Sequence, residues 1–248
     1  AYIDFHRAFD SISHSKLLHK LASYGITGNL LLWIQYFLTG RTQSVRVGSC
    51  CSRSHIVTSG VPQGSVIGPL LFIIFINDIT DVFEPMVSSK LFADDIKIYS
   101  TLSSPASFVN FQNHLNLIQT WSTIWQLPIS HSKCHTLFIG KPDQIQSISS
   151  FNIAGVLLNP TLSIVDLGIH FDHNLKFSTH INEIVNRAYQ RSHLIFRCFL
   201  SKNPNSLLRA FKVYVRPLLE YNSSIWSPNQ IGLIDSIEKV QRRFTKYV

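Results

Sequence analysis

Hydrophobic positions in the first 170 or so residues change repeatedly between helical and strand spacing. Leu17, Leu18 and Leu21 recur at helical spacing before Gly25, which predicts a helix there. Shorter apolar runs alternate with polar residues, as strands with one buried face do. The predicted helices are 13–24, 27–38, 65–82 and 107–126, and the predicted strands are 1–4, 42–47, 54–59, 87–94, 96–100, 136–139, 151–153 and 164–169. This mixture predicts an α+β protein.

From Ser178 onward the pattern predicts helices only. Three amphipathic runs follow, marked by apolar residues at Ile181 to Phe199, Leu207 to Leu218 and Leu233 to Tyr247. The change near residues 172–178 predicts a domain boundary, with one domain over 1–174 and a helical one over 175–248.

The net charge of +8 comes entirely from the C-terminal quarter. Residues 187–248 contain 11 Lys and Arg against 3 acidic residues, whereas the charges before them cancel. Two of the predicted helices carry basic residues at helical spacing: Arg209, Lys212 and Arg216 on one, and Lys239, Arg242, Arg243 and Lys246 on the other. Such a stripe is usually the solvated face of a helix. Because so few acids accompany it, contact with the phosphates of a nucleic acid is the stronger interpretation.

Leader, membrane and cysteine signals point to an intracellular protein without membrane spans. The chain shows no secretory signal, and its longest apolar stretch, Val66 to Ile76, is too short to cross a bilayer. The four cysteines fit neither a metal pair nor a disulfide framework. The abrupt start at Ala1 leads us to expect a piece of a longer polyprotein.

Two acidic segments are candidates for chemistry. Asp94 and Asp95 lie at the bend of a predicted hairpin, where a divalent cation would offset the repulsion between them. Taken alone, the pair is more often a solvated turn. Asp4 ends an apolar strand ninety positions earlier and would supply the third carboxylate that two-metal phosphoryl transfer needs. The alternative for Asp4 is an acidic residue that ends a strand.

A glycine-rich turn, Ser59 to Gly64, precedes the third predicted helix. Glycine allows a ligand to approach the backbone closely, and the Gln63 amide offers both a donor and an acceptor. By itself the segment is as well explained by an ordinary turn before a helix.

In this order, the three segments resemble the reverse transcriptases of LINE (non-LTR) retrotransposons, in particular the jockey-like group. The resemblance covers nearly the whole chain. It lies in 3–10, 57–77, 92–99, 127–133, 166–169, 215–221 and 240–243.

The resemblance implies a right-hand polymerase fold, with a palm of antiparallel strands backed by helices over 1–174 and an all-helical thumb over 175–248. The family's fingers and endonuclease would precede Asp4 and are missing from this sequence. The implied activity is RNA-directed DNA synthesis from deoxynucleoside triphosphates. The template would be the element's own RNA, the primer a nicked chromosomal DNA end, and the place of action the nucleus.

The resemblance also implies roles for single residues. Asp4 and Asp94 would hold two Mg²⁺ ions, with Mn²⁺ as an alternative, and Asp95 would support the primer-side ion. Phe9 would exclude a 2′-hydroxyl from the incoming sugar, or else be an ordinary core residue. Gln63 and Gly64 would line the nucleotide pocket. Lys133 matches a general acid for the leaving pyrophosphate, although His131 stands where the family pattern has a different residue before Ser-Lys.

Two rival functions stay open at this point. One is an inactive nucleic-acid-binding remnant of a retrotransposon polyprotein, which the intact set of three carboxylates argues against. The other is a group II intron-type maturase, which the match over 57–77 disfavours.

Overall fold

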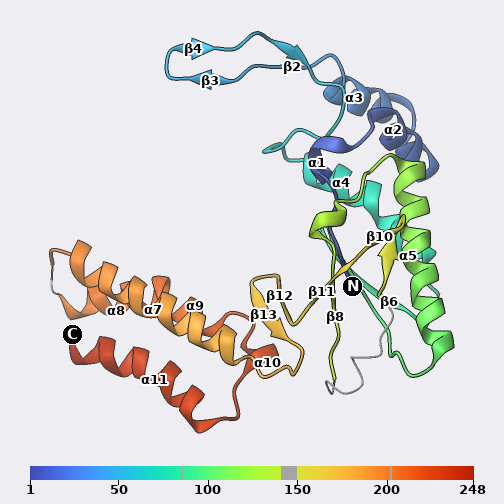
Figure 1. Ribbon diagram of the computed structural model, residues 1–248. Helices are drawn as coiled ribbons and strands as arrows, with labels where there is room; N and C mark the ends of the chain where they lie inside the picture. Colours follow the sequence, from blue (N-terminus) through green and yellow to red (C-terminus); the bar gives the residue numbers. More distant parts are fainter. Residues whose placement is uncertain (85, 141–149, 202) are drawn as a thin grey trace. The chain divides into compact units, whose positions relative to one another are not determined.

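A computed structural model describes residues 1–84, 86–140, 150–201 and 203–248, which form two compact units (Figure 1). Most of the first unit is Ala1–Thr136, and most of the second is Thr161–Val248. The first contains both helices and strands, whereas the second is largely helical. The predicted α+β class is therefore confirmed. The second unit begins before residue 175 because the strands from Ser163 to Asp172 belong to it.

The elements that lie wholly in the first unit alternate between short strands and longer helices. They are β1 (Tyr2–Ile3), α1 (Ala8–Ser11), α2 (His14–Ser23), α3 (Gly28–Leu38), β2 (Thr42–Gln43), β3 (Arg46–Val47), β4 (Cys50–Cys51), β5 (His55–Ile56), α4 (Gly68–Ile76), the 3₁₀ helix η1 (Asn77–Val82), β6 (Ser88–Phe92), β7 (Asp95–Tyr99), α5 (Pro105–Trp125), the 3₁₀ helix η2 (His131–Lys133), β9 (Asn152–Ile153) and β10 (Val156–Leu157).

One five-stranded sheet organises this part of the chain, with the order β11-β8-β1-β7-β6, where β8 is His135–Leu137 and β11 is Asn159–Thr161. The central strand β1 pairs antiparallel with both β7 and β8, and β7 pairs antiparallel with β6. The sheet as a whole is mixed, and the pairings of β1, β6, β7 and β8 are antiparallel, as predicted for the palm. Because β1 is central, the residue that follows it lies between elements from distant parts of the sequence.

The apolar periodicity places the core correctly. In α2, Leu17 and Leu21 are completely buried, and α2 packs against both α3 and α4. Helix α4 contributes Phe72 and Phe75, which are also completely buried. The predicted hairpin is confirmed as β2 paired with β5, extended by β3 paired with β4 at its tip (Figure 1).

Three predicted elements end earlier than the apolar pattern indicates. Helix α4 ends at Ile76, the last residue of the apolar run, and the chain continues as η1 from Asn77. The predicted strand over 164–169 is wrong, because Leu167 and Gly168 adopt positive φ and turn the chain between β12 (Ser163–Asp166) and β13 (Ile169–Asp172). The predicted helix through Leu218 is broken at Val215, where Pro217 in the next turn lacks the N–H that a continuous helix needs.

After β13 the second unit consists of helices α7 (Ser178–Cys198), α8 (Pro204–Tyr214), α9 (Arg216–Glu220), α10 (Ser223–Trp226) and α11 (Ile231–Lys246). It has a hydrophobic core of its own, in which Ile181, Phe211 and Phe244 are buried. At its start, the Asp172 carboxylate accepts hydrogen bonds from the backbone N–H groups of Asn174, Lys176 and Phe177, and so fixes the turn into α7. In the described part of the chain, no helix is long and apolar enough to span a bilayer.

Candidate active site

The main-chain pairing brings two of the predicted carboxylates to neighbouring strands. Tyr2 pairs with Lys97 and Ile3 with Ile96, so the same register places Asp4 opposite Asp95, the first residue of β7. Residues paired in this way point to the same face of a sheet. The turn between β6 and β7 is Ala93-Asp94, with Ala93 at φ 52°, so Asp94 lies at the tip of this hairpin next to Asp95.

These carboxylates do not form a closed ligand set. Across the residues that the structure describes, no group of three or more His, Cys, Asp or Glu side chains lies close enough to hold a metal ion. Asp4 and Asp94 are half-buried and Asp95 is exposed. The register therefore supports proximity of Asp4 and Asp95, while convergence of all three on two ions stays a prediction.

The Asp4 carboxylate lies beside a basic side chain. Its Oδ1 atom is buried and has no hydrogen-bond partner, and the Nζ atom of Lys133 lies 3.5 Å from it. The atom accepts no hydrogen bond but is paired with the Lys133 ammonium, so a metal ion at Asp4 would compete with Lys133 for this oxygen. The exposed Lys133 ammonium lies beside this carboxylate, and its role as a general acid stays a prediction.

Cys134, which the sequence analysis did not assign to the site, contacts the backbone of Asp4. The Asp4 backbone N–H donates to Cys134 Sγ at 3.4 Å, and the Asp4 carbonyl accepts from the Ser130 N–H at 2.8 Å. Cys134 is completely buried, and that burial raises the pKa of its thiol. The thiol therefore stays protonated and holds the backbone of Asp4 without adding charge.

The glycine-rich turn contacts the segment that contains Phe9 and Asp10. The backbone N–H of Gly60 donates to the Ile12 carbonyl at 2.8 Å, and that of Val61 donates to the Phe9 carbonyl at 2.9 Å. Gly60 has φ +83°, and a Cβ atom on it would lie 2.7 Å from Asp10 Cα. Both facts require glycine at this position. Two motifs fifty residues apart are thus joined through their backbones.

The nucleotide-pocket candidates lie on this joined surface. Gln63 Nε2 donates to Asp10 Oδ1 at 2.8 Å, which leaves Gln63 Oε1 as a possible acceptor. Gly64 is exposed, and nothing lies within 4 Å of a Cβ built on it. The half-buried Phe9 ring stacks on Phe72 with 4.0 Å between the centroids. Both interpretations of Phe9 stay open, since one ring face packs on the core.

A buried ion pair below this surface was missed by the sequence analysis. Lys20 is 1% exposed, and its ammonium donates to the Phe75 carbonyl and, at 2.7 Å, to Asp78 Oδ1. The Trp121 indole N–H donates to the same carboxylate oxygen at 3.0 Å, and Lys20 Nζ lies 3.5 Å from the Trp125 ring centroid. The sequence feature that could have indicated this ion pair is the position of Lys20 on the apolar face of a predicted helix, three residues after Leu17 and next to Leu21.

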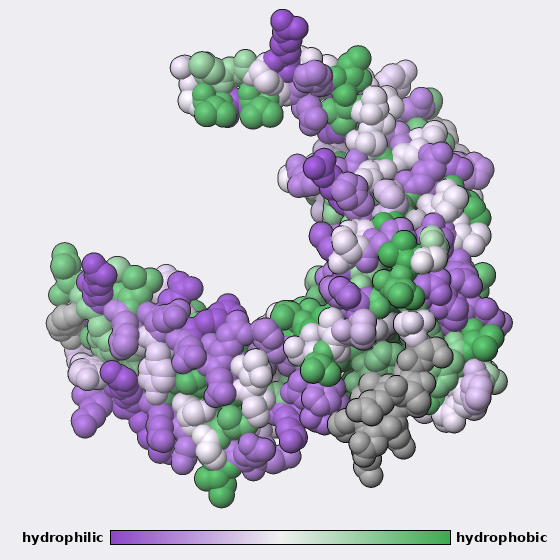
Figure 2. Space-filling view, in the orientation of Figure 1, coloured by the Kyte–Doolittle hydropathy of each residue, from purple (hydrophilic) through white to green (hydrophobic). Residues whose placement is uncertain are grey.

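Seven predicted nucleic-acid contacts lie on the C-terminal helices, and all are exposed; Figure 2 shows hydrophilic side chains over much of the visible surface there. Arg209 and Lys212 share α8, but Arg216 lies beyond the break and pairs with Glu220 at 2.6 Å. The helix that carries the predicted stripe is therefore interrupted between Lys212 and Arg216. On α11, Arg242 lies 3.9 Å from Asp235 and Arg243 lies over the Tyr189 ring, while Lys239 and Lys246 are exposed on the same helix.

Comparison with known proteins places this arrangement in a family. Residues 1–171 match the model of the family described as "Reverse transcriptase (RNA-dependent DNA polymerase)", and the chain belongs to that family. Its relatives show that this is the reverse transcriptase domain of a non-LTR retrotransposon.

Two relatives show how far the similarity extends. The chain is 29% identical over its whole length to the RNA-directed DNA polymerase from mobile element jockey of Drosophila funebris, of which it spans 28%. It is 32% identical over 74% of its length to the corresponding jockey protein of Drosophila melanogaster, of which the match spans 20%. The chain thus spans less than a third of the length of these relatives.

Proposed function

We propose that this chain performs nucleotidyl transfer, extending a DNA primer on an RNA template with deoxynucleoside triphosphates. Residues 1–174 would act as the palm that holds the reacting groups, and residues 175–248 as the thumb that contacts the template and primer. The observation that carries the proposal is the register of β1 and β7, which places Asp4 and its partner Lys133 opposite Asp95.

In this proposal the three carboxylates have different roles at the metal ions. Asp4 and Asp94 would hold two Mg²⁺ or Mn²⁺ ions, and Asp95 would support the ion on the primer side. When bound, such ions activate the attacking hydroxyl and stabilise the leaving oxygens. Lys133 would give its proton to the departing pyrophosphate, and its position 3.5 Å from Asp4 supports that role.

The surface formed by the Gly60 turn would bind the incoming nucleotide. The hydrogen bond that Gln63 Nε2 donates to Asp10 Oδ1 would orient the Gln63 amide for the incoming nucleotide. Gly64 leaves room for a base or sugar beside it. Phe9 would use its edge against the 2′ position, while its stack on Phe72 holds the ring in place.

Cleavage by bound iron tests the metal site without requiring activity. Fe²⁺ in place of Mg²⁺, with ascorbate and peroxide, produces radicals that cut the backbone near the ion. In purified residues 1–248 we expect cuts close to Asp4 and Asp94 that excess Mg²⁺ suppresses. Gel mapping of end-labelled protein locates the cuts.

The matched variants are Asp94→Asn at the hairpin tip and Asp81→Asn, which changes an exposed acid in η1. Only Asp94→Asn should abolish the cuts. Cutting that is unchanged in Asp94→Asn would contradict the metal site. The inactive binding remnant would instead bind the primer–template without showing these cuts and without extending a primer.

Binding by the C-terminal helices is expected to depend steeply on salt. Each phosphate neutralised on duplex DNA contributes about −0.9 to the slope of log affinity against log salt concentration. Replacing Arg209 and Lys212 with Ala should therefore flatten the slope by roughly one unit for each phosphate that is no longer neutralised. Fluorescence anisotropy of a labelled primer–template, titrated at several salt concentrations, measures it.

Arg216→Ala provides the comparison, because Arg216 is already paired with Glu220. We expect it to change the slope less than either α8 residue does. A slope that none of these substitutions alters would show that α8 does not contact the phosphates.

A further inference from the structure

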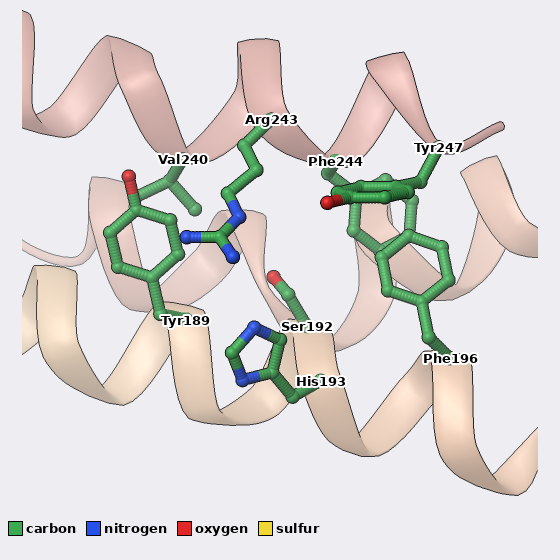
Figure 3. Close-up of a pocket in the computed structure, with 8 residues that line it drawn as sticks. All are labelled: Tyr189, Ser192, His193, Phe196, Val240, Arg243, Phe244 and Tyr247. Atoms are coloured by element: carbon green, nitrogen blue, oxygen red, sulfur yellow. The ribbon is translucent and has the colours of Figure 1, made fainter.

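A pocket of about 240 Å³ lies between α7 and α11 in the second unit (Figure 3). Most of its walls are aromatic, and no acidic residue lines it. The lining residues are Tyr189, Ser192, His193 and Phe196 of α7 and Val240, Arg243, Phe244 and Tyr247 from α11 and the residue after it. Its size is sufficient for one planar ring system.

The pocket has a cation at one end and aromatic rings at the other. Arg243 extends from α11 toward Ser192, with its guanidinium 5.6 Å from the Tyr189 ring centroid (Figure 3). Tyr247 and Phe196 meet edge to face with 5.7 Å between their centroids. Since Tyr247 is largely exposed, a flat molecule can reach these rings from solvent.

Polar groups in the pocket are few, and the positive charge of Arg243 favours an anion-bearing ligand. The Ser192 hydroxyl already donates to the Ala188 carbonyl at 2.8 Å, so it is available to the pocket as an acceptor. His193 lies exposed at the margin. On α11, Lys239, Arg243 and Lys246 follow at i, i+4 and i+7, which places three positive charges along one side of the helix.

We propose that this pocket binds one unpaired nucleobase of a single-stranded nucleic acid, with the adjoining phosphate on Arg243 and Lys246. The inference rests on the proposed nucleic-acid function and adds a specific site to it. Stacking on aromatic side chains tolerates any base, because every base has a π face. The cations along the opening favour a nucleotide over an apolar protein side chain, which would bring no negative charge to Arg243 and Lys246.

The test compares oligonucleotides with and without one base. Labelled RNA and DNA strands of about 12 nucleotides, within the usual site size, carry either a complete sequence or a single abasic position at their centre. Anisotropy at one fixed salt concentration gives the affinity of residues 1–248 for each. A short duplex at one end of each strand fixes the position at which the strand binds. The abasic position is thereby kept at the pocket.

For the unmodified protein, removing the base should weaken binding about tenfold, within the range known for base–aromatic stacking. Arg243→Met should reduce this difference to less than about twofold, because it opens one wall of the pocket. Arg242→Met removes the same charge from a residue outside the pocket, and should weaken both strands equally. Ser192→Leu fills part of the pocket and should reduce the difference between the two strands as Arg243→Met does. Thermal melting checks that this variant folds.

Equal binding of the complete and abasic strands by the unmodified protein would overturn the proposal. So would concentration-dependent self-association that Ser192→Leu abolishes, because the occupant would then be a second copy of the chain. The RNA and DNA arms show which strand supplies the base. None of these readouts involves the carboxylates, so iron cleavage at Asp4 can succeed while the pocket fails, or the reverse.

Discussion

Asp94→Asn is expected to lower primer extension by more than about 100-fold, since even residues that only orient metal ligands contribute 10–100-fold. Asparagine keeps the size of the side chain at the Ala93-Asp94 turn but cannot supply the negative charge that a divalent cation needs. Asp4→Asn should act in the same way. The measurement is extension of a DNA primer on RNA by the full-length polyprotein expected to contain this chain.

Binding separates this effect from a general loss of structure. Affinity for the primer–template should change less than twofold in both variants, since the carboxylates serve the ions and not the nucleic-acid backbone. Asp81→Asn, on the exposed side of η1, should extend at the normal rate. Near-normal extension by Asp94→Asn would remove this residue from the reaction.

The second large effect concerns stability. Asp78→Ala should lower the free energy of unfolding by about 3–5 kcal/mol, because it leaves the Lys20 ammonium buried without its counter-ion. The Trp121 indole N–H would lose its acceptor as well. Urea denaturation followed by far-UV circular dichroism measures the change, and Asp81→Ala should stay within about 0.5 kcal/mol of the unmodified protein.

The pH dependence follows from the lysine. Burial lowers the pKa of Lys20, whereas the hydrogen bond and charge of Asp78 raise it. Without Asp78 the folded-state pKa falls further below the unfolded value of about 10.4. The unfolded state then binds more protons between these two values, so stability rises with pH in that window. The loss in free energy of unfolding caused by Asp78→Ala should therefore become smaller as pH increases toward 10.

A double replacement provides the control for this explanation. Lys20→Met combined with Asp78→Leu removes both charges and should recover most of the lost stability, as apolar replacement of buried ion pairs often does. If the double variant is no more stable than Asp78→Ala, the loss comes from packing and not from an uncompensated charge.

Local pattern was enough to predict α2, the β6–β7 hairpin and the extended hairpin of β2 to β5, because each carries its periodicity within a few residues. It did not predict the end of α4 at Ile76, because Ile79 and Val82 continue the helical spacing of apolar residues beyond it. The chain reversal at Leu167-Gly168 was also missed, since its flanks read as one continuous strand. These failures come from tertiary contacts and positive φ values, not from hydrophobic spacing.

The candidate site shows the same limit. The sequence identified Asp4, Asp94 and Asp95 as candidates, but only the register of β1 and β7 places Asp4 opposite Asp95. Nothing local indicates that Gly60 must contact Asp10, or that Cys134 supports Asp4. Such contacts join residues 50 and 130 positions apart, and they exist only once the sheet has formed.

The two hydrophobic cores each contain their own tryptophans, which has a spectroscopic consequence. Trp121 and Trp125 surround Lys20 in the first unit, and the buried Trp226 donates its indole N–H to the Tyr221 carbonyl in the second. A version that keeps only Trp226 would report unfolding of the second unit by its emission, while one that keeps Trp121 would report the first. Emission curves that coincide would mean that the units melt together, and curves that separate would give each its own midpoint.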